Sequence, residues 1–181
     1  MPVTTATWRA ARAVDYAAKK EFVHAECEYE AFKHAQASVP DDFPWGRDSA
    51  LKVLKVSERF ILGEIALQKD DWGTATAFLE EAAEFEDALS YGEPPQWLQP
   101  VRHTLGAVYL KRGMYEAAER VYREDLAKWS DNGWSLYGLS RALAGQGETK
   151  QAETVMAEHQ RIWANADEPG ATSSCRCIPR T

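Results

Sequence analysis

The chain has 181 residues, 45% of them apolar and 27% charged, and its formal net charge is −7. This composition supplies a buried core, and no run approaches the roughly 18 apolar residues that a membrane-spanning helix needs. The charged fraction and the lack of a long apolar run predict that the chain does not associate with a membrane. Basic residues are scattered among carboxylates along the chain, which argues against nucleic acid as the main partner.

The first predicted element covers residues 6–39. Its aromatic and alanine positions share the spacing of a later segment, with Tyr16, Phe22, Ala25 and Tyr29 matching Tyr109, Tyr115, Ala118 and Tyr122. Lys20 stands where that later segment has Gly113, a residue that ends helices easily. The segment is therefore either two antiparallel helices or one long helix.

A loop is predicted over residues 39–46. Pro40 and Pro44 cannot continue a helix, and Gly46 follows them. Asp48 comes next, and its short carboxylate side chain predicts the N-cap of the following helix.

The second element spans about residues 56–89 and carries the same pattern. Leu62 and Gly63 precede Trp72, as Leu105 and Gly106 precede Tyr115. An insertion over residues 90–100 separates this element from the next one, and its three prolines exclude a helix. The stretch 93–97 could form a lid beside a groove, or it could anchor the insertion by packing Trp97 and Leu98 against neighbouring helices.

The last two elements, 99–132 and 133–166, repeat each other at an offset of 34 residues. The matched pairs are Leu105 with Leu139, Gly113 with Gly147, Ala118 with Ala152, and Tyr122 with Met156. Each glycine can end a first helix in a left-handed conformation, and each alanine allows two helices to approach closely.

A 34-residue period with a glycine turn and an alanine contact resembles the tetratricopeptide repeat. The resemblance implies an all-α fold, a right-handed α-solenoid of about four antiparallel helix pairs, without strands. Residues 85–145 are more narrowly similar to the C-terminal part of a group of longer bacterial repeat proteins, mostly unassigned in function. That likeness rests on residues 85–97, 100–106, 122–126 and 132–136, and it suggests a short relative or a piece of a larger architecture.

In tetratricopeptide repeats, the fifth and ninth residues of each first helix face a concave groove. The resemblance therefore implies a partner-binding groove, with Trp134 at its rim, formed by Phe60, Glu64, His103, Tyr137 and Arg141. Aromatic faces together with charged groups suit an extended peptide or a chain terminus. Alternatively, these are ordinary groove residues, some of them covered by the protein's own loop or tail.

Asp125 stands where alanine is usual in the repeat, so its carboxylate should be shielded and should need a partner. Arg102 on the preceding helix is the predicted partner, in a structural ion pair. His103 has no other histidine at metal-binding spacing and is predicted to be a structural or partner-contacting hydrogen-bonding group.

The polar tail, residues 167–181, contains Cys175 and Cys177, whose thiolates could share a soft metal ion with His103 if the tail folds back. Two cysteines alone do not complete a zinc site, and a tail without a metal is the simpler expectation. The third cysteine, Cys27, lies in a helical pattern and is predicted to be buried or half-buried.

Three classes of function remain open from the sequence. A protein- or peptide-binding scaffold is favoured, a small metal-binding protein is the alternative, and an enzyme with a site between groove and insertion is the third. No nucleophile elbow, phosphate-binding loop or paired-carboxylate motif occurs, so we expect neither an enzyme nor a cofactor. The start of the chain lacks a basic stretch followed by an apolar one, which favours a cytoplasmic location.

Overall fold

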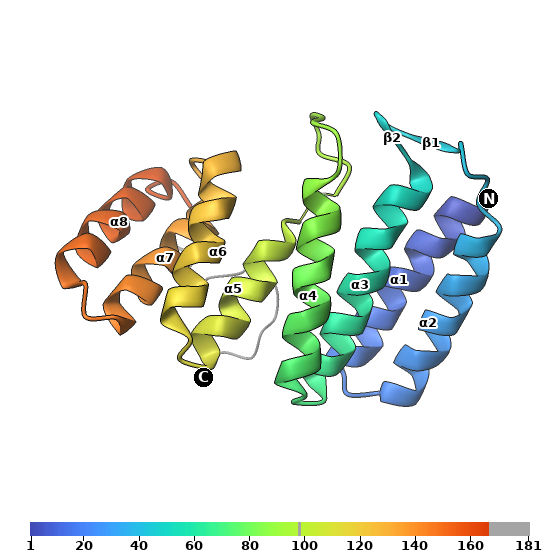
Figure 1. Ribbon diagram of the computed structural model, residues 1–181, viewed down its shortest axis with the longest axis horizontal. Helices are drawn as coiled ribbons and strands as arrows, with labels where there is room; N and C mark the ends of the chain where they lie inside the picture. The colour runs from blue at the N-terminus through green and yellow to red at the C-terminus, as the bar shows by residue number, and fades with distance from the viewer. Residues whose placement is uncertain (98, 167–181) are drawn as a thin grey trace. The chain divides into compact units, whose positions relative to one another are not determined.

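The computed structural model describes residues 1–97 and 99–166. These residues fold into eight helices and a hairpin of two short strands, within two compact units that divide between Val101 and Arg102. The predicted all-α fold of paired helices is confirmed (Figure 1). None of the helices in the described residues is long and apolar enough to cross a membrane.

The first unit contains two helix pairs joined by the hairpin. Its elements are α1 (Pro2–Ala18), α2 (Phe22–Ala37), β1 (Pro44–Trp45), β2 (Asp48–Ser49), α3 (Ala50–Gln68) and α4 (Trp72–Asp87). Helix α1 packs against both α2 and α3, and α3 packs against α4. The core of this unit includes Phe32, Leu54, Ile61 and Leu79, each of them almost fully buried. Burying one such side chain contributes roughly 1.5–3 kcal/mol to folding.

The second unit contains the remaining helix pairs. They are α5 (Val101–Lys111), whose first residue ends the first unit, α6 (Tyr115–Lys128), α7 (Gly133–Gly145) and α8 (Thr149–Ile162). Helix α7 packs against both α6 and α8. Tyr122 of α6 is fully buried, and its ring lies against both Gly106 of α5 and Gly138 of α7.

All four helix pairs turn in the same way. The residue two positions after each first helix has a positive φ: 61° at Lys20, 59° at Asp70, 70° at Gly113 and 84° at Gly147. Each turn has the two backbone hydrogen bonds of a Schellman motif, such as Glu21 N–H to Tyr16 C=O at 2.9 Å and Lys20 N–H to Ala17 C=O at 2.9 Å. Residues 6–37 thus form two helices, with Lys20 in the conformation that glycine adopts elsewhere.

The loop before α3 differs from the prediction in two ways. It contains a short antiparallel ladder, in which Trp45 pairs with Asp48 across a turn with Gly46 at φ 62°, although no strand was expected. Ser49, rather than Asp48, is the N-cap of α3. The Asp48 carboxylate instead accepts hydrogen bonds from the Ser90 N–H at 2.7 Å and the Ser90 hydroxyl at 3.2 Å.

Candidate protein-interaction site

One face of α7 carries three accessible side chains suited to contacting a partner. Trp134, Tyr137 and Arg141 are spaced i, i+3 and i+7, which places them on the same side of a helix. Trp134 and Tyr137 are half-buried, and Arg141 is exposed. We call these three residues the α7 row.

The start of α7 is fixed by its N-cap. The Asn132 side-chain oxygen accepts from the N–H groups of Trp134 at 3.1 Å and Ser135 at 3.4 Å. These two hydrogen bonds satisfy backbone donors in the first turn that have no partner within the helix, and they fix the direction in which the Trp134 side chain projects.

Rings from α8 and from its C-cap residue pack against the two aromatic members of the row. The Trp134 ring lies 5.1 Å from Trp163, edge to face at 86°, and Tyr137 lies 5.6 Å from His159. His159 is buried, and its Nδ1 lies 2.9 Å from the Gly133 carbonyl oxygen. Because these neighbours are packed, the two aromatic members of the α7 row present pre-formed faces.

Trp163 and His159 were not singled out from the sequence, although a signal for Trp163 exists. Trp129 and Trp163 are also 34 residues apart, and both are C-cap residues, of α6 and α8. The same offset that revealed the helix turns therefore marks this aromatic residue.

His103 adjoins the α7 row but is itself only 1% exposed. Its ring lies 5.8 Å from Trp134, and its Nε2 lies 2.6 Å from Asn132 Nδ2 and 3.4 Å from Asp125 Oδ2. Asp125 also accepts from Asn132 Nδ2 at 3.0 Å and from the Ser135 hydroxyl at 2.6 Å. The predicted structural role of His103 fits this arrangement, in which a buried polar cluster ties α5 to α6 and α7.

The predicted pair of Arg102 with Asp125 needs a correction. Arg102 Nε instead donates to Glu124 at 3.1 Å, on the exposed side of α6, while the buried Asp125 lies with His103, Asn132 and Ser135. Burial of Asp125 was anticipated correctly. Its partners come from α5, from the α6–α7 connection and from α7, and helix spacing alone does not bring these three together.

The two remaining groove candidates, Phe60 and Glu64, are in α3 of the first unit and are 4% and 3% exposed. The Phe60 ring packs edge-on against Trp97 at 5.6 Å. This contact matches the anchoring role considered for Trp97, while Leu98 lies outside the described residues. Among the six candidates, the accessible side chains are those of the α7 row.

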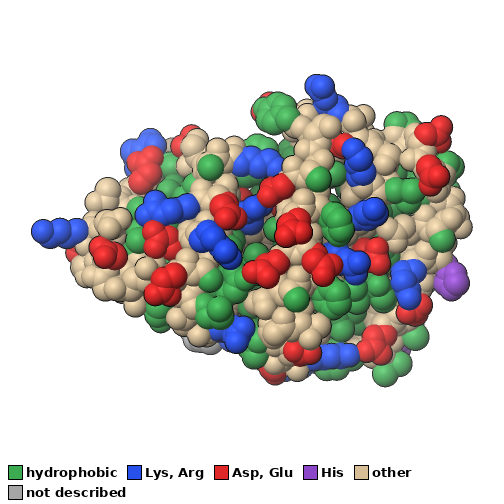
Figure 2. Space-filling view, viewed as in Figure 1, with side chains coloured by type: hydrophobic (Ala, Val, Ile, Leu, Met, Phe, Trp, Pro, Cys, Tyr) green, Lys and Arg blue, Asp and Glu red, His purple; other side chains and the backbone are tan. Residues whose placement is uncertain are grey.

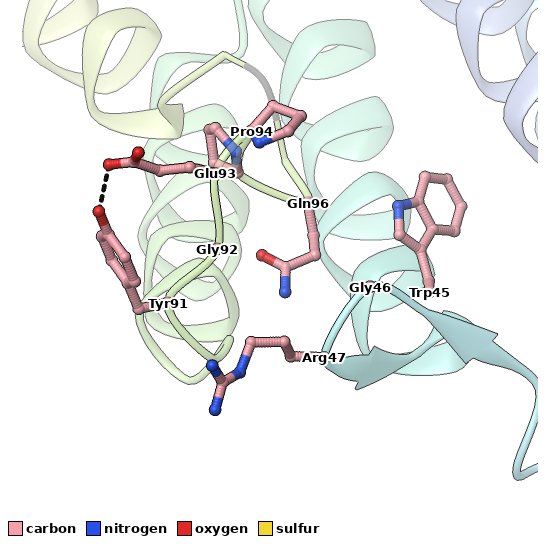
Figure 3. Close-up of a pocket in the computed structure, with 9 residues that line it drawn as sticks. Trp45, Gly46, Arg47, Tyr91, Gly92, Glu93, Pro94 and Gln96 are labelled. Carbon is pink, nitrogen blue, oxygen red and sulfur yellow. Dashed lines mark hydrogen bonds between the residues drawn. The ribbon is translucent and has the colours of Figure 1, made fainter.

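A separate open cavity of about 620 Å³ lies in the first unit, between the hairpin and the proline-containing insertion (Figure 3). Its walls include Trp45 and Arg47 on one side and Tyr91 on the other, with the Gln96 amide between the two rings. Gln96 Nε2 lies 3.4 Å from Asp48 Oδ2, which joins the insertion to the hairpin. The cavity wall thus offers aromatic surface and the Arg47 cation, and the Tyr91 hydroxyl donates to the Glu93 carboxylate on the same wall.

The metal hypothesis has no counterpart in the described residues, where no three histidine, cysteine or acidic side chains gather closely enough to hold an ion. Cys175 and Cys177 lie outside the described part of the chain. Cys27 is exposed rather than buried, because it lies on the outer side of α2.

On the face drawn in Figure 2, basic and acidic side chains are interspersed.

Comparison with protein families decides the nature of the repeats. A family model described as tetratricopeptide repeat matches residues 99–124 and 133–158. The chain therefore carries tetratricopeptide repeats in these two segments. The matched segments contain most of α5 and α6 and of α7 and α8, so the α7 row lies on the first helix of a tetratricopeptide repeat. A search of curated proteins finds no match to the chain.

Proposed function

We propose that this chain is a binding scaffold that holds an extended peptide segment of a protein partner on the α7 row. The observation that carries the proposal is the accessible, one-sided placement of Trp134, Tyr137 and Arg141 on the first helix of a repeat. Tetratricopeptide repeats generally serve protein–protein interaction, which supports a binding role for this chain.

The chemistry of the row defines the kind of segment it suits. The two aromatic faces favour apolar or proline side chains of an extended chain, which lose little freedom on binding. Arg141 is exposed and can form a two-pronged pair with a carboxylate. We therefore infer a segment with apolar side chains next to a carboxylate, either an acidic side chain or a chain terminus.

Paired variants test the proposal. Tyr137→Ala with Arg141→Ala should reduce the partner recovered with the purified chain at least tenfold, because it removes one aromatic face and the cation. The matched control is Lys150→Ala with Glu153→Ala, two exposed residues of α8, which should leave recovery unchanged. Circular dichroism checks that all chains are folded. Equal recovery from both variants would remove the α7 row as the binding site.

A further inference from the structure

A second surface suited to a partner lies on α1, in the first unit. The Trp8 side chain is 50% exposed, which is unusual for a large apolar group. The guanidinium carbons of Arg9 and Arg12 lie 4.6 Å and 4.5 Å from the centre of the Trp8 ring. The exposed indole is thus contacted by two cations, within the range of cation–π attraction.

One carboxylate of α2 fixes both arginines. Glu28 accepts from Arg9 Nη1 at 2.8 Å through one oxygen and from Arg12 Nε at 2.8 Å through the other. Burial raises the pKa of Glu28, but the two guanidinium hydrogen bonds outweigh it and hold this pKa below its ordinary value. Arg12 Nη2 also donates to the Tyr16 hydroxyl at 3.1 Å. Both arginine side chains are therefore held in place before any partner arrives.

The charge count at this surface favours an acidic partner. Two guanidinium groups share one carboxylate, which leaves one positive charge in excess beside the indole, in a chain whose net charge is −7. The side chains of Arg9 and Arg12 are 32% and 38% exposed, so each still presents donors to solvent. Tryptophan and arginine are the residues most enriched where protein interfaces concentrate their binding energy.

Pre-organisation strengthens this argument. A long arginine side chain normally loses rotamer freedom when it binds, and this loss weakens binding. Glu28 has already removed most of that freedom here. A second copy of the chain fits the surface less well, because a two-fold contact would bring the excess positive charge of each copy against the other.

We propose that Trp8, Arg9 and Arg12 form a second docking surface, for an acidic segment of a partner protein in which carboxylates flank an apolar side chain. The apolar side chain packs on the Trp8 ring, and the carboxylates accept from the outward donors of Arg9 and Arg12. This surface lies in the first unit and is independent of the α7 row.

Titration of the full-length, ¹⁵N-labelled chain with a synthetic peptide tests the proposal. The probe is a short blocked peptide in which glutamate alternates with leucine and phenylalanine, and its control has glutamine in place of each glutamate. The indole N–H signal of Trp8 is identified by its loss in Trp8→Phe. The acidic peptide should shift this signal and the α1 amides, and should bind at least tenfold more tightly than the glutamine peptide. Added salt should weaken binding, because it screens exposed charges.

Variants locate the effect. Trp8→Ala should weaken binding of the acidic peptide at least tenfold, and Arg9→Gln should reduce the preference for glutamate, since Arg12 still pairs with Glu28. Arg141→Gln should leave the peptide-induced shifts of the Trp8 indole and the α1 amides unchanged, which separates this surface from the α7 row. Equal affinity for the two peptides, or shifts that spare Trp8, would overturn the proposal. Self-association that Trp8→Ala abolishes would instead assign the surface to a second copy and overturn it too.

Discussion

Single small residues set how closely the helices of the second unit approach. The Tyr122 ring occupies the space where Gly106 and Gly138 lack side chains, and a Cβ atom at either glycine would overlap the ring. Since Tyr122 is fully buried, its ring has no free volume into which to move. The two glycines are therefore required by packing rather than by backbone conformation.

Gly106→Ala should lower the free energy of unfolding by about 1–3 kcal/mol, because the added methyl group forces the Tyr122 ring or the helices to shift. Gly73→Ala is the control, since a Cβ atom at this helical glycine meets nothing within 4 Å. That variant should be slightly more stable, by about 0.4–1 kcal/mol. Denaturant unfolding measures both, and a neutral Gly106→Ala would contradict the close contact.

Ala118 is 0% exposed, as its place in the 34-residue repeat predicts. Ala118→Leu should lower the unfolding midpoint, with a loss of about 1–3 kcal/mol, because three extra carbon atoms have no space between the paired helices. Glu116→Gln on the exposed side of α6 should leave the midpoint unchanged. Equal effects in thermal melts would mean that the helix is rotated from this orientation.

At the scale of elements, the four helix turns show what spacing can and cannot predict. The period of 34 residues located the glycine turns at Gly113 and Gly147, because glycine adopts a positive φ without steric cost. The same turn has no local signal at Lys20 and only a weak one at Asp70, since aspartate adopts a positive φ more readily than most residues but less readily than glycine. Packing of the paired helices imposes it there.

Lys20→Gly should raise the free energy of unfolding by about 0.5–1 kcal/mol. A left-handed conformation costs a non-glycine residue about 1–2 kcal/mol, and glycine removes this cost. Part of the gain is lost because glycine has more backbone entropy in the unfolded chain. The neighbouring Lys19 has φ −83°, so Lys19→Gly should instead lower stability by about 0.5–1 kcal/mol. Denaturation curves of the two variants should shift in opposite directions. Shifts of the same sign would contradict the turn geometry.

Two buried carboxylates tie elements of the first unit together and make it sensitive to acid. Burial raises the pKa of Glu28, but hydrogen bonds from Arg9 and Arg12 outweigh it and leave this pKa below its ordinary 4.5. Burial likewise raises the pKa of Asp48, but hydrogen bonds from Ser90 and Lys52 outweigh it and leave this pKa below its ordinary 3.8. A carboxylate whose pKa is lowered in the folded state stabilises the fold at pH values above its ordinary pKa. This stabilisation is lost as the pH falls through the lowered pKa.

The first unit should therefore lose stability as the pH falls below 4.5, and Glu28→Gln should make this dependence shallower. Glu30→Gln, an exposed carboxylate of the same helix, is the matched control and should leave the slope unchanged. Unfolding free energies measured across this pH range compare the three chains. Identical slopes for Glu28→Gln and the unmodified chain would disprove the assignment.

For the whole molecule, local sequence patterns predicted the class of fold, but they predicted fewer of the side-chain contacts at the candidate site. Helical spacing and the repeat period were sufficient for paired helices, because each repeat forms mainly by contacts close in sequence. Asp48 shows the limit: its short side chain suggested an N-cap, but its partner Ser90 is 42 residues away. The neighbours of Asp125 and the burial of Phe60 and His103 likewise depend on packing that spacing does not encode.

Site-specific photo-crosslinking in cells tests most directly whether a protein partner contacts the α7 row. A photoreactive amino acid is placed at Tyr137 in one chain and at Glu153, on the exposed side of α8, in another. We predict a discrete crosslinked partner from position 137 that Arg141→Ala diminishes, and none from position 153. Crosslinks of equal yield at both positions, or from position 153 alone, would contradict partner binding at the α7 row.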